Sequence, residues 1–280
     1  MKRFVIFVLT AVMGASCYSQ KLILHYDFKK AENNIVTDRT KSHHNGTLIG
    51  SAQIKSEQGE TYADLGYDNG YIDMGKGIGE QLQSIDDFTV AVKYNVEEKA
   101  SLSGNGYFLW AFSTLEQNTQ HEGRYHAYKL NVQRGENSIG GWANETILEI
   151  GKQSEKGKWL HAVYTQKGSI GILYLNGQQV DANNDMFTVD RTFPDEAPAF
   201  NWIGRAPFKG DAFLAGTKIA DVTIPETTKS ADENGFYNIE YPIPSELLIN
   251  ADGTPKKQIT FRLQASSTTL CPGLYFLRLL

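Results

Sequence analysis

Cysteine is nearly absent from this chain of 280 residues, which contains only Cys17 and Cys271. Only Cys271 remains if Cys17 is cleaved off or becomes a lipidated terminus, so an internal disulfide framework is excluded even in an oxidising compartment. A domain of about 200 residues is large enough to bury a substantial core without such crosslinks.

Proline is missing from most of the chain. None precedes Pro194, and five of the eight prolines lie at or after Pro225. Because proline removes a hydrogen-bond donor from a β-ladder, its absence suits central strands. Its return near Pro225 marks a domain boundary.

Several signatures of catalysis and metal binding are also missing. The sequence has no Gly-x-Ser-x-Gly motif, no phosphate-binding loop and no dinucleotide fingerprint. Its six histidines show no spacing typical of a transition-metal site, and no cysteine is placed to assist them. The pair His43-His44 is followed by Asn45-Gly46, which indicates a turn.

The charge balance is acidic, with a formal net charge of −5 at pH 7. An acidic protein has little reason to bind nucleic acid or an acidic membrane surface. Lys2-Arg3 and the short apolar run 4–14 predict a secretory signal peptide over residues 1–19. That run is too short to anchor the mature protein across a bilayer, and no later segment is apolar enough to do so.

Two interpretations of the signal cleavage stay open. Gly14-Ala15-Ser16-Cys17 resembles a lipoprotein box, which would make Cys17 an acylated N-terminus. Cleavage after Ser19 would instead leave Gln20 first. Either one predicts an exported protein, located in the periplasm, at the cell surface or in the medium.

Residues 156–180 carry the clearest structural signal. Trp159, His161 and Val163 alternate with the residues between them, and a second alternating run covers 170–175. Asn176-Gly177 then supplies the dipeptide that accepts the two positive φ values of a type I′ turn. Alternating runs joined by such turns predict an antiparallel sheet.

Three further segments predict strands. Residues 88–96 alternate regularly, and residues 107–113 are apolar on both faces, as in a central strand. Residues 125–133 also alternate, with Lys129, Asn131 and Gln133 on the polar face. No amphipathic run of helical period is longer than about two turns.

The segment 156–180 resembles the hairpin of the laminin-G-like, concanavalin-A-like jelly rolls, W-x-H-x-x-x-T…L-Y-x-N-G-x-x-V. Further segments resemble that family in its order: LHYDF (24–28), DRTKSHHNGTLIG (38–50), GYIDMG (70–75), DDFTVAVKYNV (86–96), NWIGRAPF (201–208) and IADVTIPE (219–226). The resemblance implies an all-β fold, an antiparallel two-sheet jelly-roll sandwich over residues 20–225. Such modules mostly bind carbohydrate or protein and only sometimes catalyse, and the fold alone does not choose between these functions.

The end of the chain has a different character. Residues 226–240 are interpreted as a linker and residues 241–280 as a short tail of β character. YPIPSELLIN (241–250) and the final CPGLYFLRLL resemble the start and end of a C-terminal β sorting domain of Bacteroidetes-type bacteria. Ile243 departs from that pattern, and the middle strand motif is missing. A truncated segment of a longer enzyme therefore stays open as the alternative.

The sequence argues against catalysis. Jelly-roll glycosidases of the laminarinase type carry E-x-D-x-x-E on one strand, and this chain has no such motif. Glu145 and Glu149 would share one face of a strand but lie ~13 Å apart along it. Retaining pairs need about 5 Å and inverting pairs about 6.5–9.5 Å. If the protein is an enzyme, the resemblance implies a glycoside hydrolase.

The resemblance also implies one structural Ca²⁺, as related modules often hold near the sheet edge. Asp38 and Asn45 match the early loop of the family, and Asp221 in the closing strand is the implied companion. Calcium takes six to eight oxygen ligands, so carbonyls and waters would complete the site. The alternative is that Asp38 caps a turn and Asp221 pairs with a lysine.

Polar and aromatic residues predict a glycan site on the concave sheet face and its loops. A sugar ring stacks its apolar face on Trp or Tyr, and its hydroxyls bond to amides, carboxylates and guanidinium groups. Trp142, in the Gly-rich loop GGWANE, is the strongest stacking candidate, whereas Trp110 and Trp159 are expected in the core. The complete set of candidates is Asn131, Gln133, Arg134, Trp142, Asn144, Glu145, Trp202 and Arg205.

Three functions follow from these features. The leading hypothesis is an exported, non-catalytic, lectin-like module that binds a polysaccharide or oligosaccharide, or a cell-surface protein. This version resembles modules joined to arabinofuranosidase-type catalytic domains. The alternatives are a structural or adhesive domain without a sugar site, and a glycoside hydrolase or an accessory fragment of one.

Overall fold

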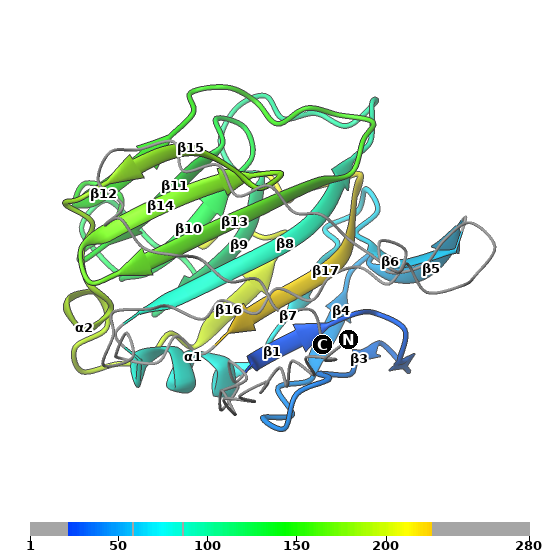
Figure 1. Cartoon of the computed structure of the whole chain (residues 1–280), viewed down its shortest axis with the longest axis horizontal. Coiled ribbons are helices and arrows are strands. Elements are labelled where there is room, and N and C mark those ends of the chain that lie inside the picture. The colour runs from blue at the N-terminus through cyan, green and yellow to red at the C-terminus, as the bar shows by residue number, and fades with distance from the viewer. Residues whose placement is uncertain (1–21, 58, 86, 226–280) are drawn as a thin grey trace, which may run out of the picture. The chain divides into compact units, whose positions relative to one another are not determined.

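The computed structural model describes residues 22–57, 59–85 and 87–225 (Figure 1). All of these belong to one compact unit, Met1–Asn238. The predicted signal peptide (1–19), linker (226–240) and tail (241–280) lie outside the described residues.

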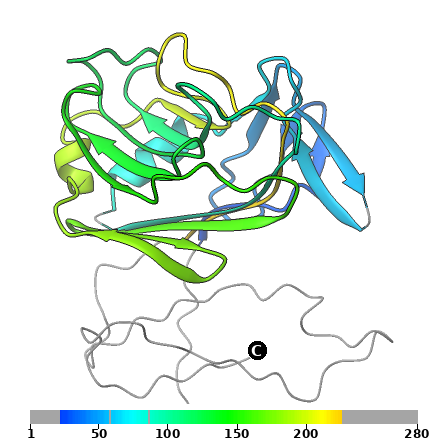
Figure 2. The ribbon, with the colours of Figure 1, turned by 90° about the horizontal axis from the view of Figure 1, so that it is seen from above.

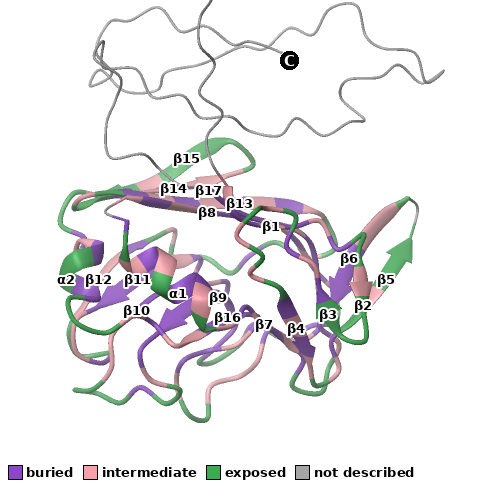
Figure 3. Ribbon diagram, turned by 90° about the horizontal axis from the view of Figure 1, so that it is seen from below, coloured by how far each residue is buried: buried purple, intermediate pink, exposed green. Residues whose placement is uncertain are grey.

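Two antiparallel sheets form a sandwich, which confirms the predicted jelly roll; Figure 3 shows the two layers edge-on. The eight-stranded sheet runs in the order β15 (Gln178–Asn183), β14 (Ile170–Leu175), β13 (Leu160–Lys167), β8 (Phe88–Val96), β17 (Thr217–Pro225), β6 (Glu60–Asp64), β5 (Gln53–Glu57), with β1 (Leu22–Tyr26) also paired to β17. The nine-stranded sheet runs in the order β12 (Glu145–Glu149), β11 (Arg134–Ser138), β10 (Tyr125–Lys129), β9 (Phe108–Ser113), β16 (Phe200–Ile203), β7 (Tyr71–Asp73), β4 (Gly46–Ile49), β3 (Ile35–Val36), β2 (Ala31–Glu32).

The first and last described strands close the eight-stranded sheet together. β1 pairs with β17, and β17 pairs with β8. These strands match the segments LHYDF and IADVTIPE, which the sequence analysis compared with the family's first and closing strands. Residues at the two ends of the domain therefore meet in the middle of one sheet.

The predicted hairpins are confirmed. β13 pairs with β14 from Ala162↔Leu175 to Lys167↔Ile170, and β14 pairs with β15 across the Asn176-Gly177 turn. Asn176 has φ 50° and Gly177 has φ 78°, as a type I′ turn requires. β8 and β9 also lie where alternation and continuous hydrophobicity predicted strands, and all six residues of β9 are buried.

The single strand predicted over 125–133 is wrong in extent. β10 ends at Lys129, and residues 130–133 form the turn to β11. Gln133 takes a positive φ of 49°, which is incompatible with an extended strand. The alternation of residues 130–133 thus belongs to a turn, and Asn131 and Gln133 do not share a strand face with Arg134.

The core lies between the inner faces of the sheets and is rich in aromatic rings. Trp110 is buried as predicted and meets Tyr164 of the opposite sheet with ring centroids 5.7 Å apart. Trp159 differs from the prediction, because it is only partly buried and lies just before β13 on the outer side of the eight-stranded sheet. Strand alternation explains the difference, since neighbouring Leu160 occupies the inward position.

Two short helices accompany the sheets, α1 (Lys76–Gln83) and α2 (Val189–Thr192). Gln83 Nε2 of α1 donates a hydrogen bond to the carbonyl of Phe193 after α2, at 3.0 Å. Within the described ranges, neither helix has the length and apolar character needed to cross a membrane.

One histidine is sealed between the sheets. His126 on β10 contacts the ring of Phe88 with centroids 5.0 Å apart and that of Phe193 at 5.4 Å. Burial lowers the pKa of His126 from 6.5 to about 3, so the folded protein holds it neutral. The unfolded chain binds this proton near pH 6.5. Through this group, the free energy of unfolding is highest above pH 6.5, and it decreases as the pH falls from 6.5 toward 3.

We predict that His126→Gln makes the free energy of unfolding less dependent on pH below 6.5. The wild-type free energy of unfolding should lose about 1.4 kcal/mol per pH unit below 6.5 through this group, and the variant should lack that part. Urea unfolding of both proteins between about pH 7 and pH 4 measures the difference. His43→Gln, at an exposed position, is the matched control. Parallel curves for wild type and His126→Gln would contradict the assignment.

Candidate functional site

Three of the residues predicted to bind a sugar, Arg134, Glu145 and Trp202, lie on the outer face of the nine-stranded sheet. Residues paired directly across strands share a face, and so do residues two apart in one strand. The register therefore places two rows on the outer side: Trp202–Ala111–Ala127–Glu136 and Phe200–Ser113–Tyr125–Ser138–Glu145. Trp202 and Glu136 are three strands apart, which is ~14 Å.

A charge cluster, defined as Lys129, Arg134, Glu136, Glu145 and Tyr125, occupies the β10–β12 side of this face. Glu136 is fully buried and pairs with Lys129 Nζ at 3.1 Å and with Arg134 Nε at 2.5 Å. Arg134 Nη2 also reaches Glu145 Oε2 at 3.2 Å, and the hydroxyl of Tyr125 donates to the other oxygen of Glu145. One guanidinium therefore holds both carboxylates.

The electrostatics of the charge cluster follow from its burial. Desolvation raises the pKa of Glu145, and the neighbouring charge of Glu136 raises it further. Burial also raises the pKa of Tyr125, which stays a neutral hydrogen-bond donor. Oε1 of Glu136 has no hydrogen-bond partner among the described residues. A polar ligand that reaches this oxygen would find an unused acceptor.

Arg134 and Glu145 were predicted from the sequence as site residues, whereas Lys129, Glu136 and Tyr125 were not. Alternation within RGENS places Arg134, Glu136 and Ser138 on one face of β11. That pattern could have indicated Glu136. The pairing of β10 with β11, which brings Lys129 opposite Arg134, has no signal in the sequence alone.

The middle of the outer face is covered. The loop 204–216 crosses it, on the side away from the eight-stranded sheet (Figure 2). Phe208 of this loop packs against Phe108 and Tyr125, with ring centroids 5.9 and 5.2 Å apart. Small residues of the sheet, among them Ala111 and Ala127, belong to the same apolar cluster. The loop separates the charge cluster from Trp202.

Trp142 remains available to a ligand. Its side chain is 52% exposed, and it lies in the 139–144 loop between β11 and β12. Three backbone amides of this loop, at residues 141, 142 and 143, donate to carbonyls of residues 123, 119 and 120. Asn144 is exposed and bonds to the carbonyl of Gly140 at 3.0 Å. Glu145 follows directly, so the loop joins the charge cluster.

Trp202 of β16 and Arg205, near the start of the loop 204–216, form a packed unit. Trp202 is only 2% exposed, and the guanidinium carbon of Arg205 lies 4.0 Å from its ring centroid. Arg205 also donates to the hydroxyl of Tyr71 at 3.1 Å and to Glu116 Oε1 at 3.0 Å. This contact leaves the Trp202 ring little surface on which a sugar could stack.

Asn131 and Gln133 lie at the opposite end of the strands from Trp142. Asn131 Nδ2 donates to the carbonyl of Gly104 at 2.8 Å, and Gln133 Nε2 donates to that of Gln153 at 3.4 Å. The length of β11, ~13 Å, separates their turn from the 139–144 loop. The structure does not bring these two residues together with Trp142.

The residues expected to bind calcium are engaged in hydrogen bonds. The carboxylate of Asp38 accepts from the backbone amides of His25, Thr40 and His44 and from the hydroxyl of Thr40. Asn45 Oδ1 accepts from the amide of Asp38, and Asp221 bonds to His25 Nε2 at 3.1 Å. These oxygens are thus hydrogen-bonded within the protein. No group of three acidic, His or Cys ligands occurs among the described residues. Calcium stays a prediction that no observation tests.

We predict that substituting Trp202 and Trp142 changes the stability by very different amounts. Trp202→Ala should lower the free energy of unfolding by about 3–5 kcal/mol, because it removes a buried ring beneath Arg205. Trp142→Ala should change it by less than about 0.5 kcal/mol. Urea denaturation of the two variants makes the comparison. A large loss for Trp142→Ala would mean that the exposed ring supports the fold.

Similar solved structures share the fold at low sequence identity. The receptor-binding domain of botulinum neurotoxin mosaic serotype C/D is 13% identical, with a TM-score of 0.52 over 77% of this chain and 49% of that one. A mutant Trypanosoma rangeli sialidase with trans-sialidase activity is 14% identical, with a TM-score of 0.50 over 76% of this chain and 32% of that one. Domain 4 of AbnA, an extracellular arabinanase from Geobacillus stearothermophilus solved with arabinotriose, is 16% identical, with a TM-score of 0.48 over 74% and 93%.

The chain thus spans about half of the toxin domain and about a third of the sialidase. A search of curated proteins found no match. Residues 66–233 match a family described as the concanavalin A-like lectin/glucanases superfamily, of the laminin G type. This match covers more than half of the chain and includes the central strands of both sheets. The chain belongs to the concanavalin A-like lectin/glucanase superfamily.

Proposed function

We propose that this protein is an exported, non-catalytic, carbohydrate-binding module that uses the 139–144 loop and the adjoining charge cluster to bind a polysaccharide or oligosaccharide. Export rests on the predicted signal peptide, residues 1–19. The bacterial setting, in which such modules serve polysaccharide use, rests on the resemblance of the tail to a sorting domain.

The observation that carries the proposal is the exposure of Trp142. An indole that is 52% exposed leaves apolar area in water, at a cost that a purely structural residue would avoid. The loop beneath it is tethered by three backbone hydrogen bonds to residues 119–123. A tethered loop loses less entropy on binding than a free one, which favours a preformed stacking platform.

The neighbouring polar groups suit the rest of a sugar. Asn144 can donate and accept, Glu145 accepts, and Arg134 donates from a fixed position between two carboxylates. Sugar hydroxyls need such paired donors and acceptors around one stacking ring. Trp202, Arg205, Asn131 and Gln133 have packing contacts of their own and are left out of the proposed site.

We predict that Trp142→Ala weakens binding to a recognised polysaccharide by about tenfold or more, because the stacking surface is lost. Affinity electrophoresis or calorimetry against arabinan, xylan, pectin and host glycans, each with and without calcium, measures this. Tyr67→Ala is a matched control, since Tyr67 is an aromatic with 51% exposure in the β6–β7 connection. The control should keep wild-type affinity.

The proposal would be overturned if the folded wild type bound no polysaccharide of the panel. It would favour the alternative of an adhesive module that contacts cell-surface proteins. Equal losses in Trp142→Ala and Tyr67→Ala would also contradict the site, since they would show a general loss of aromatic surface.

A glycoside hydrolase remains a second candidate because of one observation. Glu145 pairs with Ser138, and Glu136 is two residues away on the same strand face, so the two glutamates are diagonal neighbours. Diagonal neighbours lie about 7–8 Å apart at the backbone, and one guanidinium contacts both carboxylates, so the two carboxyl groups are close enough to act as a pair. The raised pKa of Glu145 also suits a general acid.

We predict no turnover of chromogenic glycosides, because Arg134 contacts both carboxylates and Glu136 is fully buried. Release of nitrophenol from a panel of nitrophenyl glycosides tests this. Turnover by the wild type that disappears in both Glu136→Gln and Glu145→Gln would establish the hydrolase. Turnover that survives both substitutions would indicate a contaminating enzyme.

A further inference from the structure

A pocket of about 240 Å³ opens on the other sheet of the sandwich. Its lining consists of Glu57, Glu60, Tyr62, Trp159 and Lys218. Leu160 and Tyr94, which pair across β13 and β8, belong to the core, so the alternate residue Trp159 lies on the outer side. The pocket is therefore on the face opposite the proposed Trp142 site.

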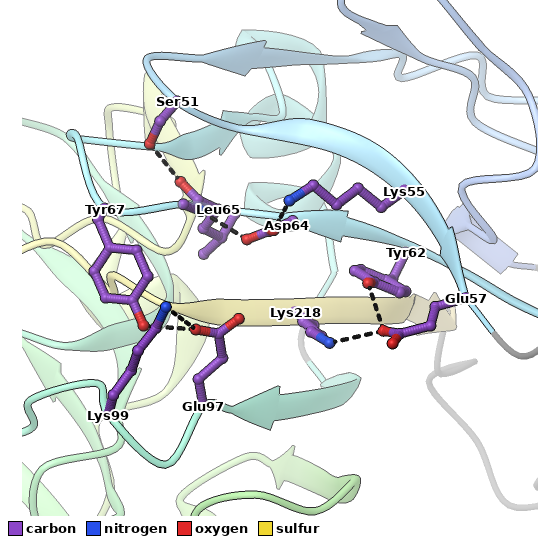
Figure 4. A network of polar contacts seen from close by, with 11 residues as sticks. Ser51, Lys55, Glu57, Tyr62, Asp64, Leu65, Tyr67, Glu97, Lys99 and Lys218 are labelled. Carbon is purple, nitrogen blue, oxygen red and sulfur yellow. Dashed lines mark hydrogen bonds and ion pairs between the residues drawn. The ribbon is translucent and has the colours of Figure 1, made fainter.

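The β5–β6 hairpin forms one wall. It projects beyond the sandwich (Figure 3) and carries Glu57, Glu60 and Tyr62. Figure 4 shows how it is fixed: Lys55 Nζ bonds to Asp64 Oδ2 at 2.6 Å, and Lys218 Nζ of β17 bonds to Glu57 Oε2 at 3.1 Å. The hydroxyl of Tyr62 donates to the same oxygen of Glu57 at 3.1 Å.

Two aromatic rings contact each other in the pocket, and a different lysine ammonium lies near each ring. Tyr62 and Trp159 make an edge contact, with centroids 5.9 Å apart and planes at 64°. Lys93 Nζ lies 5.4 Å from the Trp159 centroid and 3.1 Å from Glu60 Oε2. Lys218 Nζ lies 5.0 Å from the Tyr62 centroid. The lining thus holds two aromatic rings and the pair of Lys218 with Glu57, while Glu60 is paired with Lys93 from outside the lining.

Stability does not explain this arrangement. The side chains of Glu57 and Glu60 are 57% and 37% exposed, and exposed ion pairs contribute only about 0–1 kcal/mol each. Trp159 is only partly buried, on the outer side of the sheet. A partly exposed indole next to two exposed carboxylates is the composition of a site that stacks a ring and accepts hydrogen bonds from its hydroxyls.

The charges restrict the class of ligand. Two glutamates face two lysines, so the local charge is balanced. An anionic ligand would meet both carboxylates, and a cationic ligand would compete with the lysines that already face the rings. The volume is below the range of about 300–1,000 Å³ for drug-sized ligands, which limits the occupant to a small ring.

We infer that this pocket is a second saccharide site, which takes one neutral sugar unit, such as a terminal or side-branch residue of a glycan. Trp159 is the stacking surface, Glu57 and Glu60 accept from the sugar hydroxyls, and Lys218 donates to one of them. The inference rests on the proposed function only for the class of ligand, because the pocket shares no residue with the Trp142 site.

The indole N–H signals of the full chain provide the test. The sequence has four tryptophans, so a ¹⁵N-indole-labelled sample gives four such signals, and Trp159→Phe assigns the one of interest. The probes are methyl glycosides of arabinose, xylose, galactose and glucose, with glucuronic acid and glucosamine as charged comparisons. We expect one neutral glycoside to shift the Trp159 signal in the wild type and equally in Trp142→Ala. The isosteric variant Glu60→Gln should weaken that titration by about tenfold.

Three results would overturn the inference. The first is a Trp159 signal that no neutral glycoside moves up to its solubility limit. The second is a shift produced only by the charged sugars. The third is a shift that is lost in Trp142→Ala, which would mean a single shared site. Failure of the Trp142 site alone would leave the Trp159 titration in place, so the two proposals fail separately.

Discussion

The sandwich depends on contacts between large buried rings of the two sheets, such as the contact between Trp110 and Tyr164. The ring of Tyr164 also lies against β11 at Gly135. A Cβ at this position would come within 2.9 Å of the tyrosine ring, so glycine permits the close approach. Because strand residues alternate, the inward Gly135 sends Arg134 and Glu136 outward. The packing of the core thereby sets the orientation of the charge cluster.

The charge cluster is difficult to explain by stability alone. A buried carboxylate such as Glu136 requires partners, and Arg134 and Lys129 supply them. Yet well-packed apolar residues in place of a buried ion network are often equally stabilising. The network also leaves Oε1 of Glu136 without a partner among the described residues. Retaining this network is consistent with a polar site next to the exposed Trp142.

Much of the fold could be predicted from alternation and turn residues, because these depend on local backbone chemistry. β8, β9 and the Asn176-Gly177 hairpin are examples. The candidate site was harder to predict from the sequence, because a distant loop decides which side chains of the outer face are buried. Trp142 and Trp202 look alike in sequence, but Arg205 packs on the ring of Trp202, whereas Trp142 is half exposed. The prediction of a core position for Trp159 is wrong because the alternation of strand residues defines two faces of the sheet but does not indicate which face is inward.

The positions of the two proposed sugar sites have a consequence for how the module would act. The Trp142 loop belongs to the nine-stranded sheet, whereas Trp159 lies on the outer side of the eight-stranded sheet. Two sites on one glycan chain raise its avidity only if that chain can span both. A stiff polysaccharide cannot follow a path around the edge of a sandwich. Sites on opposite faces therefore favour the bridging of two glycan chains, or of two branches, over binding to a longer stretch of one chain.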